Sequence, residues 1–161
     1  MKKILIMRHA KSDWSDGSLR DYDRPLNPRG EKAAPLIGKH IKKQNLTPDL
    51  IISSPALRAR MTAEAVAEKC EYDNDIVWNE NFYFGHTNEV IKALRNVDEK
   101  YKSVMVFGHN PTWSDLAERL TGDFFGMKTA DVAVLEFDDN WKKLDDKKCK
   151  LINYLSPKEL K

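Results

Sequence analysis

Short apolar runs alternate with helical patterns along the whole chain, and this alternation limits the possible folds more than any other feature. Three runs rich in branched residues, each bounded by polar residues, lie at residues 4–7, 50–53 and 104–107. Their length and composition are typical of buried parallel strands. Weaker runs predict three further strands, at residues 76–78, 132–137 and 150–154.

Apolar residues recur at helical spacing in four segments between these runs, around residues 33–41, 59–67, 90–94 and 113–120. Gly122 is expected to end the last helix. A capping side chain followed by proline predicts a helix start, and this pair occurs at Asn27-Pro28, Ser54-Pro55 and Asn110-Pro111. Strands that alternate with helices predict an α/β domain with a mainly parallel sheet.

The length and charge of the chain restrict its partners. We interpret residues 1–161 as one domain, because that length is typical of one. The formal net charge of +2 gives no reason to expect nucleic acid or a membrane surface as partner. The apolar start is too short for a signal peptide or membrane span, and Cys70 and Cys149 lack metal or redox spacing. A cytoplasmic protein with reduced thiols is expected, and the charged run at 138–150 is interpreted as a solvated turn.

Polar side chains follow three of the expected strands, at the point where each strand ends. Arg8 and His9 follow the first strand, Ser54 and Arg58 the second, and His109 the third. In open α/β sheets, ligands bind beyond the carboxyl ends of the strands, so these side chains are expected to converge there. Two arginines and two helix N-termini at one edge would attract an anion strongly.

This set of side chains suits phosphoryl transfer. Arginine matches phosphate geometry with paired N–H donors. A neutral histidine is a nucleophile if one ring nitrogen is free and the other donates, usually to a backbone carbonyl. Arg8, Arg58 and His109 would supply positioning and charge stabilisation without a metal. Taken singly, Arg58 could be a surface residue and His109 a turn cap, so it is their joint placement that favours function.

The same residues resemble the motifs of the histidine phosphatase (phosphoglycerate mutase-like) superfamily. Residues 8–10 are similar to its Arg-His-Gly signature, residues 53–63 to its second-arginine motif, and residues 108–111 to its second-histidine motif. Residues 21–26, which read Asp-x-x-Arg-Pro-Leu, and the order of the segments resemble the SixA-type phosphohistidine phosphatase branch. The resemblance covers nearly the whole chain.

The resemblance implies a fold, a reaction and roles for four residues. The fold would be a three-layer α/β/α sandwich whose mainly parallel sheet has one antiparallel strand. His9 would be the nucleophile and become transiently phosphorylated, while Arg8, Arg58 and His109 hold the phosphoryl oxygens, with no metal or organic cofactor. The substrate would be phosphohistidine in a protein or a related phosphoramidate. Ala10 replaces the usual glycine, so the local turn must accept a Cβ.

Two alternatives stay open. In the first, the protein is a general phosphatase of small phosphomonoesters, with Glu80 as the acid. Many family members use a carboxylate after the third strand to protonate the leaving oxygen, and Glu80 is the best-placed candidate. Glu80 can equally be interpreted as a solvated loop residue. An alkoxide needs a proton to leave, whereas a phosphorylated imidazole leaves easily once its ring is protonated. The second alternative is a non-catalytic phosphate-binding module, which would not need a free nucleophilic histidine.

Overall fold

Six strands form one sheet in the computed structural model, which describes residues 1–160. Their order is β3-β2-β4-β1-β5-β6. Their bounds are β1 Lys2–Arg8, β2 Leu50–Ser53, β3 Ile76–Trp78, β4 Ser103–Gly108, β5 Val132–Phe137 and β6 Lys150–Leu155. Within the described residues, β5 runs antiparallel to both of its neighbours and the other five strands share one direction. The mainly parallel sheet and its one antiparallel strand are confirmed.

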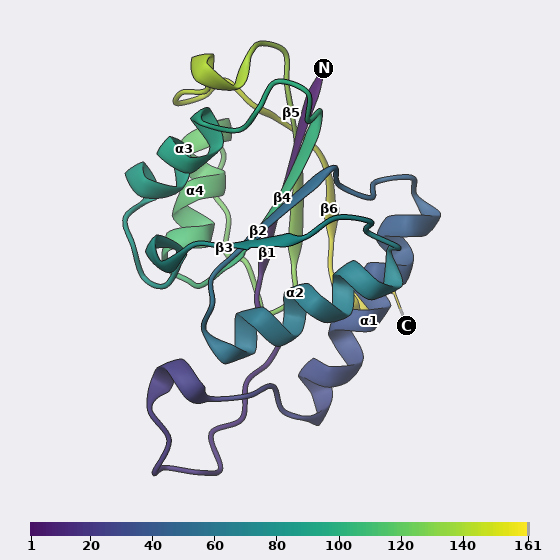
Figure 1. Ribbon diagram of the computed structural model, residues 1–161, viewed down its shortest axis with the longest axis vertical. Coiled ribbons are helices and arrows are strands. Elements are labelled where there is room, and N and C mark those ends of the chain that lie inside the picture. The colour runs from purple at the N-terminus through teal and green to yellow at the C-terminus, as the bar shows by residue number, and fades with distance from the viewer. Residues whose placement is uncertain (161) are drawn as a thin grey trace.

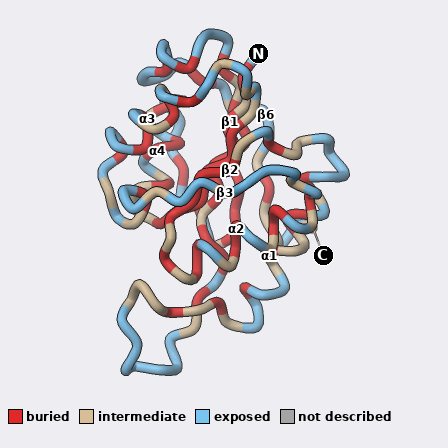
Figure 2. Tube along the Cα trace, in the orientation of Figure 1, coloured by how far each residue is buried: buried red, intermediate tan, exposed pale blue. Residues whose placement is uncertain are grey.

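Four helices cover the two faces of this sheet. Helices α1 (Pro28–Lys43) and α2 (Leu57–Lys69) lie on one face, and α3 (Thr87–Arg95) and α4 (Thr112–Thr121) lie on the other (Figure 1). Side chains of β1 alternate between two cores: Leu5 packs toward α1 and α2, whereas Ile6 packs toward α3 and α4. Burial on both faces explains why the strands read as continuous apolar runs (Figure 2). The three-layer sandwich is confirmed.

The starts of the helices follow the sequence expectation in part. The Asn27 side chain accepts a hydrogen bond from the Gly30 N–H, so α1 begins at Pro28 as expected. Helix α2 begins at Leu57, two residues after the proline at which it was expected to begin. That prediction was wrong because the Ser54 hydroxyl accepts a hydrogen bond from the Ala56 N–H in the turn before the helix. The same hydroxyl lies within hydrogen-bond distance of His109 Nε2. Gly122, in the left-handed conformation, ends α4 as predicted.

The charged run at residues 138–150 is only partly solvated, so its interpretation as a solvated turn was wrong. Trp141 and Leu144 are fully buried, and the Trp141 indole N–H donates to the Tyr101 carbonyl oxygen. A short 3₁₀ helix at Trp141–Lys143 places the indole in the core while its charged neighbours stay exposed. The sequence pattern missed this burial because charged residues outnumber apolar ones in the segment.

The two cysteines lie in different cores, Cys70 on the side of α1 and α2 and Cys149 on the side of α3 and α4. Both are free and buried, and burial raises the pKa of each thiol. Among residues 1–160, no helix combines the length and the apolar character that crossing a bilayer requires.

Candidate active site

A cavity of about 610 Å³ opens where the carboxyl ends of β1, β2 and β4 meet. Backbone hydrogen bonds hold these strand ends together, since the His9 N–H donates to the Gly108 carbonyl and the Ser54 N–H to the Phe107 carbonyl. Arg8, His9, Arg58 and His109 all line the cavity. The structure therefore brings together the four side chains that were expected from the sequence to converge at the carboxyl ends of the strands.

A long loop between β1 and α1, residues 9–27, forms much of the cavity wall. It projects beyond the end of the sheet and returns to the start of α1 (Figure 1), and its tip is exposed (Figure 2). A β-bridge between Ser12 and Leu26 closes the base of the loop. Besides His9, the loop contributes to the lining Lys11, Ser12, Trp14, Asp21 and Arg24.

His9 is held in one tautomer. Its Nδ1 lies 2.6 Å from the Ala10 carbonyl oxygen, and because a carbonyl only accepts, Nδ1 must carry the proton. Nε2 keeps its lone pair. Burial lowers the pKa of His9 to about 4, and the charges of Arg58 and Arg8 act in the same direction. At neutral pH the imidazole is therefore uncharged and nucleophilic at Nε2.

His109 is almost completely buried next to His9, with the two ring centroids 5.1 Å apart. Its Nε2 lies 2.8 Å from the Ser54 hydroxyl oxygen. Its Nδ1 is buried and has no hydrogen-bond partner among the described residues. Burial, with the neighbouring His9 and Arg58, lowers the pKa of His109 to about 2. The ring is packed against Phe84, at a centroid distance of 5.0 Å.

The two arginines are fixed by backbone oxygens. Arg8 donates from Nη1 to the Met127 carbonyl at 3.0 Å. Burial lowers its pKa while the charge of Asp131 acts against that shift, and the guanidinium stays charged at neutral pH. Arg58 is 2% exposed and donates from Nη1 to the Asp21 carbonyl and from Nη2 to the Asp21 carboxylate. Arg58 is thus not a surface residue.

Asp21 is the residue of this site that the sequence reasoning missed. Its carboxylate accepts hydrogen bonds from Arg58, Arg24 and the Tyr83 hydroxyl, so it ties the loop to α2 and to the segment after β3. Partial burial acts to raise the pKa of Asp21, but the bonds from Tyr83 and Arg58 bring it below its usual value. From the sequence, Asp21 was considered only as part of the segment 21–26 that resembles the family, and nothing there indicated its contact with Arg58.

Glu80 is not brought into the cavity. It is exposed at the start of a short 3₁₀ helix, Glu80–Phe82, and its carboxylate accepts a hydrogen bond from the Tyr22 hydroxyl at 3.2 Å. Of the described residues that line the cavity, Asp21 is the one carboxylate. No trio of histidine, cysteine or acidic side chains within residues 1–160 is arranged to hold a metal ion.

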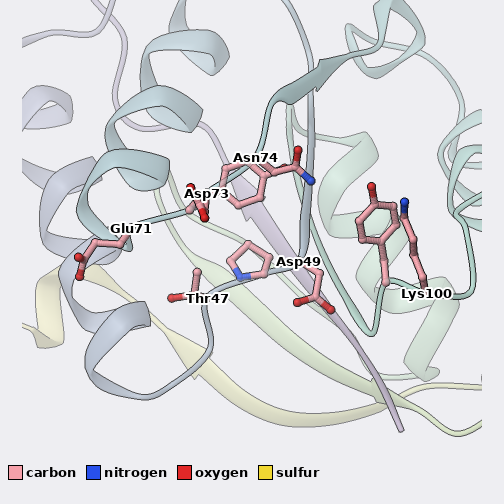
Figure 3. Close-up of a pocket in the computed structure, with 9 residues that line it drawn as sticks. Thr47, Asp49, Glu71, Asp73, Asn74 and Lys100 are labelled. Atoms are coloured by element: carbon pink, nitrogen blue, oxygen red, sulfur yellow. The ribbon is translucent and has the colours of Figure 1, made fainter.

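A second cavity, of about 510 Å³, lies at the opposite edge of the sheet, before the amino ends of β2, β3 and β4. Its labelled side chains come from three separate connections (Figure 3). Two of its carboxylates already have partners, since Asp49 accepts the Lys102 and Ser103 N–H groups and Glu71 pairs with Lys42. The cavity that holds His9 is therefore the candidate active site.

The free energy of unfolding is expected to fall as the pH is lowered from about 7 to about 4.5. His9 and His109 stay neutral in the folded protein over this range, whereas in the unfolded chain they bind protons near pH 6.5. Protons therefore favour the unfolded chain. Asp21 contributes to the loss of stability only at lower pH, below its unfolded pKa of 3.8.

Urea unfolding at both pH values measures this difference. The double variant His9→Asn/His109→Gln is expected to show a smaller pH dependence than the wild type, because it lacks both buried rings that stay neutral in the folded protein. A wild-type protein that is equally stable at both pH values would show that the two rings are not held neutral.

Comparisons with known proteins identify the family. Residues 4–83 match the model of the histidine phosphatase superfamily (branch 1). The SixA structure from Agrobacterium tumefaciens is 31% identical, with a TM-score of 0.84 over 97% of this chain and 98% of that one. The structure of the protein histidine phosphatase SixA complexed with tungstate is 25% identical, with a TM-score of 0.86 over 99% of both chains.

Sequence relatives agree with these structural matches over most of the chain. An uncharacterized protein of Mycobacterium tuberculosis is 30% identical over 166 residues, which cover 94% of this chain and all of the relative. An uncharacterized chloroplastic protein of Arabidopsis thaliana is 30% identical over 88% of this chain and 69% of its own length. The chain belongs to the histidine phosphatase superfamily, in its SixA-type branch, and is a phosphatase.

Proposed function

We propose that this phosphatase works through a phosphohistidine intermediate on His9 and hydrolyses phosphohistidine in proteins or a related phosphoramidate. One observation carries the proposal: the neutral His9 ring, fixed at Nδ1 by the Ala10 carbonyl, is accompanied by Arg8, Arg58 and His109 in the lining of one cavity. These are the parts that phosphoryl transfer needs, namely a free nucleophile and fixed positive charge.

In the first step, the lone pair on His9 Nε2 attacks the phosphorus of the substrate. A P–Nε2 bond forms while the bond from phosphorus to the substrate nitrogen breaks, and the bonding electrons stay on that nitrogen. A substrate ring that is protonated on its other nitrogen then leaves as neutral imidazole. Arg8, Arg58 and His109 hold the phosphoryl oxygens, and the arginines offset their negative charge.

In the second step, water attacks the phosphorus of phosphorylated His9. A bond forms between phosphorus and the water oxygen while the P–Nε2 bond breaks and its electrons return to the ring. The protons of the water stay on the inorganic phosphate or pass to solvent. Phosphorylated His9 carries a positive ring charge because Nδ1 keeps its proton. The Ala10 carbonyl, 2.6 Å from Nδ1, stabilises that charge and keeps the ring in position for both steps.

The acid–base groups of the cavity support a nitrogen leaving group. Asp21 is held in its ionised form by Arg58, Arg24 and Tyr83, so it has no proton to give to an alkoxide. Glu80 lies outside the lining. An imidazole needs no such acid, because protonation from solvent already makes its ring a good leaving group. The similarity to the protein histidine phosphatase SixA supports the same substrate class.

A substrate panel tests this assignment. The kcat/KM for a phosphohistidine peptide is expected to exceed that for phosphomonoesters with an alkoxide leaving group, such as a phosphoserine peptide, by about a hundredfold or more. That factor is the contribution that general-acid catalysis would otherwise supply. Initial rates of phosphate release measure it. Equal or greater kcat/KM on the phosphomonoesters would reject the proposed substrate class.

The Glu80→Gln variant is expected to keep the wild-type kcat/KM on phosphohistidine peptide and on a phosphoserine peptide, whose alkoxide leaving group depends on an acid. The reason is that Glu80 is exposed, does not line the cavity and bonds to Tyr22. Glu64→Gln, an exposed change on α2, is the matched control. A selective loss of about 10²-fold or more with the phosphomonoester would instead make Glu80 the acid of that reaction.

A further inference from the structure

The cavity carries more positive charge than one phosphoryl group requires. A phosphoryl group brings a charge of about −1.5 to −2, which Arg8 and Arg58 balance. Asp21 contacts both Arg58 and Arg24, and its one negative charge offsets one further positive charge. Lys11, Arg29 and Lys128 also line the cavity, and none of the three forms an ion pair within residues 1–160. Three exposed cations therefore lack an internal counter-charge.

Backbone contacts bring together the segments that carry Lys11 and Arg29. The Asn27 N–H donates to the Lys11 carbonyl at 2.9 Å, which joins the chain after His9 to the start of α1. Gly30 permits this approach, because a Cβ there would lie only 2.2 Å from the Lys11 carbonyl oxygen. Lys11 and Arg29 therefore begin from adjoining backbone, and both line the cavity. An anionic group bound at this side of the cavity would be attracted by both charges.

Lys128 comes from a separate segment that is attached to the phosphoryl site. The Met127 carbonyl accepts a hydrogen bond from Arg8, and the Ala130 N–H is shared between the Arg8 and His9 carbonyls. The positive charge around His9 thus comes both from the start of α1 and from the segment before β5. This spread suits a ligand with several negative groups around the phosphoryl group.

Two aromatic side chains in the cavity lining remain more exposed than buried. Trp14 is 73% exposed and Phe84 is 51% exposed. Trp14 is held in place by the buried Arg24, whose guanidinium carbon lies 3.3 Å from the centroid of the indole ring. Aromatic residues such as these are enriched at surfaces that bind another protein.

We infer that the mouth of this cavity is a docking surface for an acidic protein, and that Lys11, Arg29 and Lys128 bind carboxylates that flank its phosphohistidine. The inference rests on the proposed function and adds to it a preference for acidic sequence around the target residue. Complementary charge of this kind acts mainly on the encounter of the two proteins, so its effect is expected in kcat/KM and to weaken with salt.

Two phosphohistidine peptides that differ only in flanking glutamates or glutamines test the inference. Wild-type protein is expected to favour the glutamate peptide about tenfold in kcat/KM at low salt, as three exposed ion pairs together would give. The Lys11→Gln/Arg29→Gln variant is expected to lose most of this ratio. The matched control Lys32→Gln/Lys39→Gln changes two exposed lysines elsewhere on α1 and is expected to keep it.

A charge reversal provides a second readout. Lys11→Glu/Arg29→Glu is expected to favour a peptide flanked by lysines over the glutamate peptide. Equal turnover of the glutamate and glutamine peptides by the wild type, or an unchanged ratio in Lys11→Gln/Arg29→Gln, would overturn the docking surface. Wild-type protein that turns over phosphomonoesters but neither peptide nor phosphoimidazole would overturn the proposed function itself.

Discussion

The His9→Ala variant is expected to lose about 10⁴-fold or more of the wild-type kcat on a phosphohistidine peptide. Removal of the ring removes the atom on which the phosphoryl group is carried, and Arg8, Arg58 and His109 can then bind the substrate but not split its reaction into two steps. KM is expected to change much less than kcat, because the arginines and His109 remain. Initial rates at saturating and at low substrate concentrations separate the two effects.

His40→Ala is the matched control for this variant, since His40 lies on α1 and does not line the cavity. The phosphorylated intermediate can also be trapped by quenching the reaction with phosphohistidine substrate at alkaline pH, which preserves the P–N bond. Mass spectrometry should then find phosphate on the peptide that contains His9. If His9→Ala turned over at the wild-type rate, or phosphate appeared on another residue instead, His9 would not be the nucleophile.

The Arg58→Ala variant is expected to lower kcat by about 10² to 10³-fold, the usual cost of removing one fixed group that stabilises transition-state charge. Arg58 is buried at the start of α2 with its guanidinium oriented by Asp21, so its charge is positioned before substrate arrives. Arg58→Lys keeps the charge but loses the paired donors, and an intermediate rate is expected.

Arg60→Ala is a close control, because Arg60 is exposed two residues further along the same helix. Urea unfolding of both variants separates loss of activity from loss of stability, as Arg58→Ala also leaves the Asp21 carboxylate without one of its donors. Equal activity of the Arg58 and Arg60 variants would remove Arg58 from the phosphoryl site.

Most of the secondary structure followed from local pattern. The expected strands at residues 50–53, 76–78 and 132–137 have those same bounds in the structure, and Asn27 and Gly122 mark helix ends as predicted. Local signals suffice here because a strand buried on both faces must be apolar, and a helix end must satisfy its own N–H or C=O groups. The direction of β5 followed only from the family resemblance, since both strand directions show similar apolar patterns.

The side chains whose role depends on distant contacts were harder to place. Ser54 was interpreted as a helix cap, but its hydroxyl lies beside His109, 55 residues away in sequence. Trp141 was assigned to a solvated turn, but its indole is buried in a core built from other elements. In each case the neighbours that decide the burial or the partner are far along the chain, so no local window contains the information.

The sequence by itself predicted an α/β chain in which Arg8, His9, Arg58 and His109 follow strands of a mainly parallel sheet and converge, because the carboxyl ends of parallel strands lie at one edge of the sheet. Only the tertiary structure decided the protonation of His9 and the orientation of Arg58. The Ala10 carbonyl and burial keep His9 neutral, Asp21 orients Arg58 across the loop, and Glu80 lies outside the cavity. Desolvation and long-range hydrogen bonds set these properties, and both exist only once the loop, the helices and the sheet are packed together.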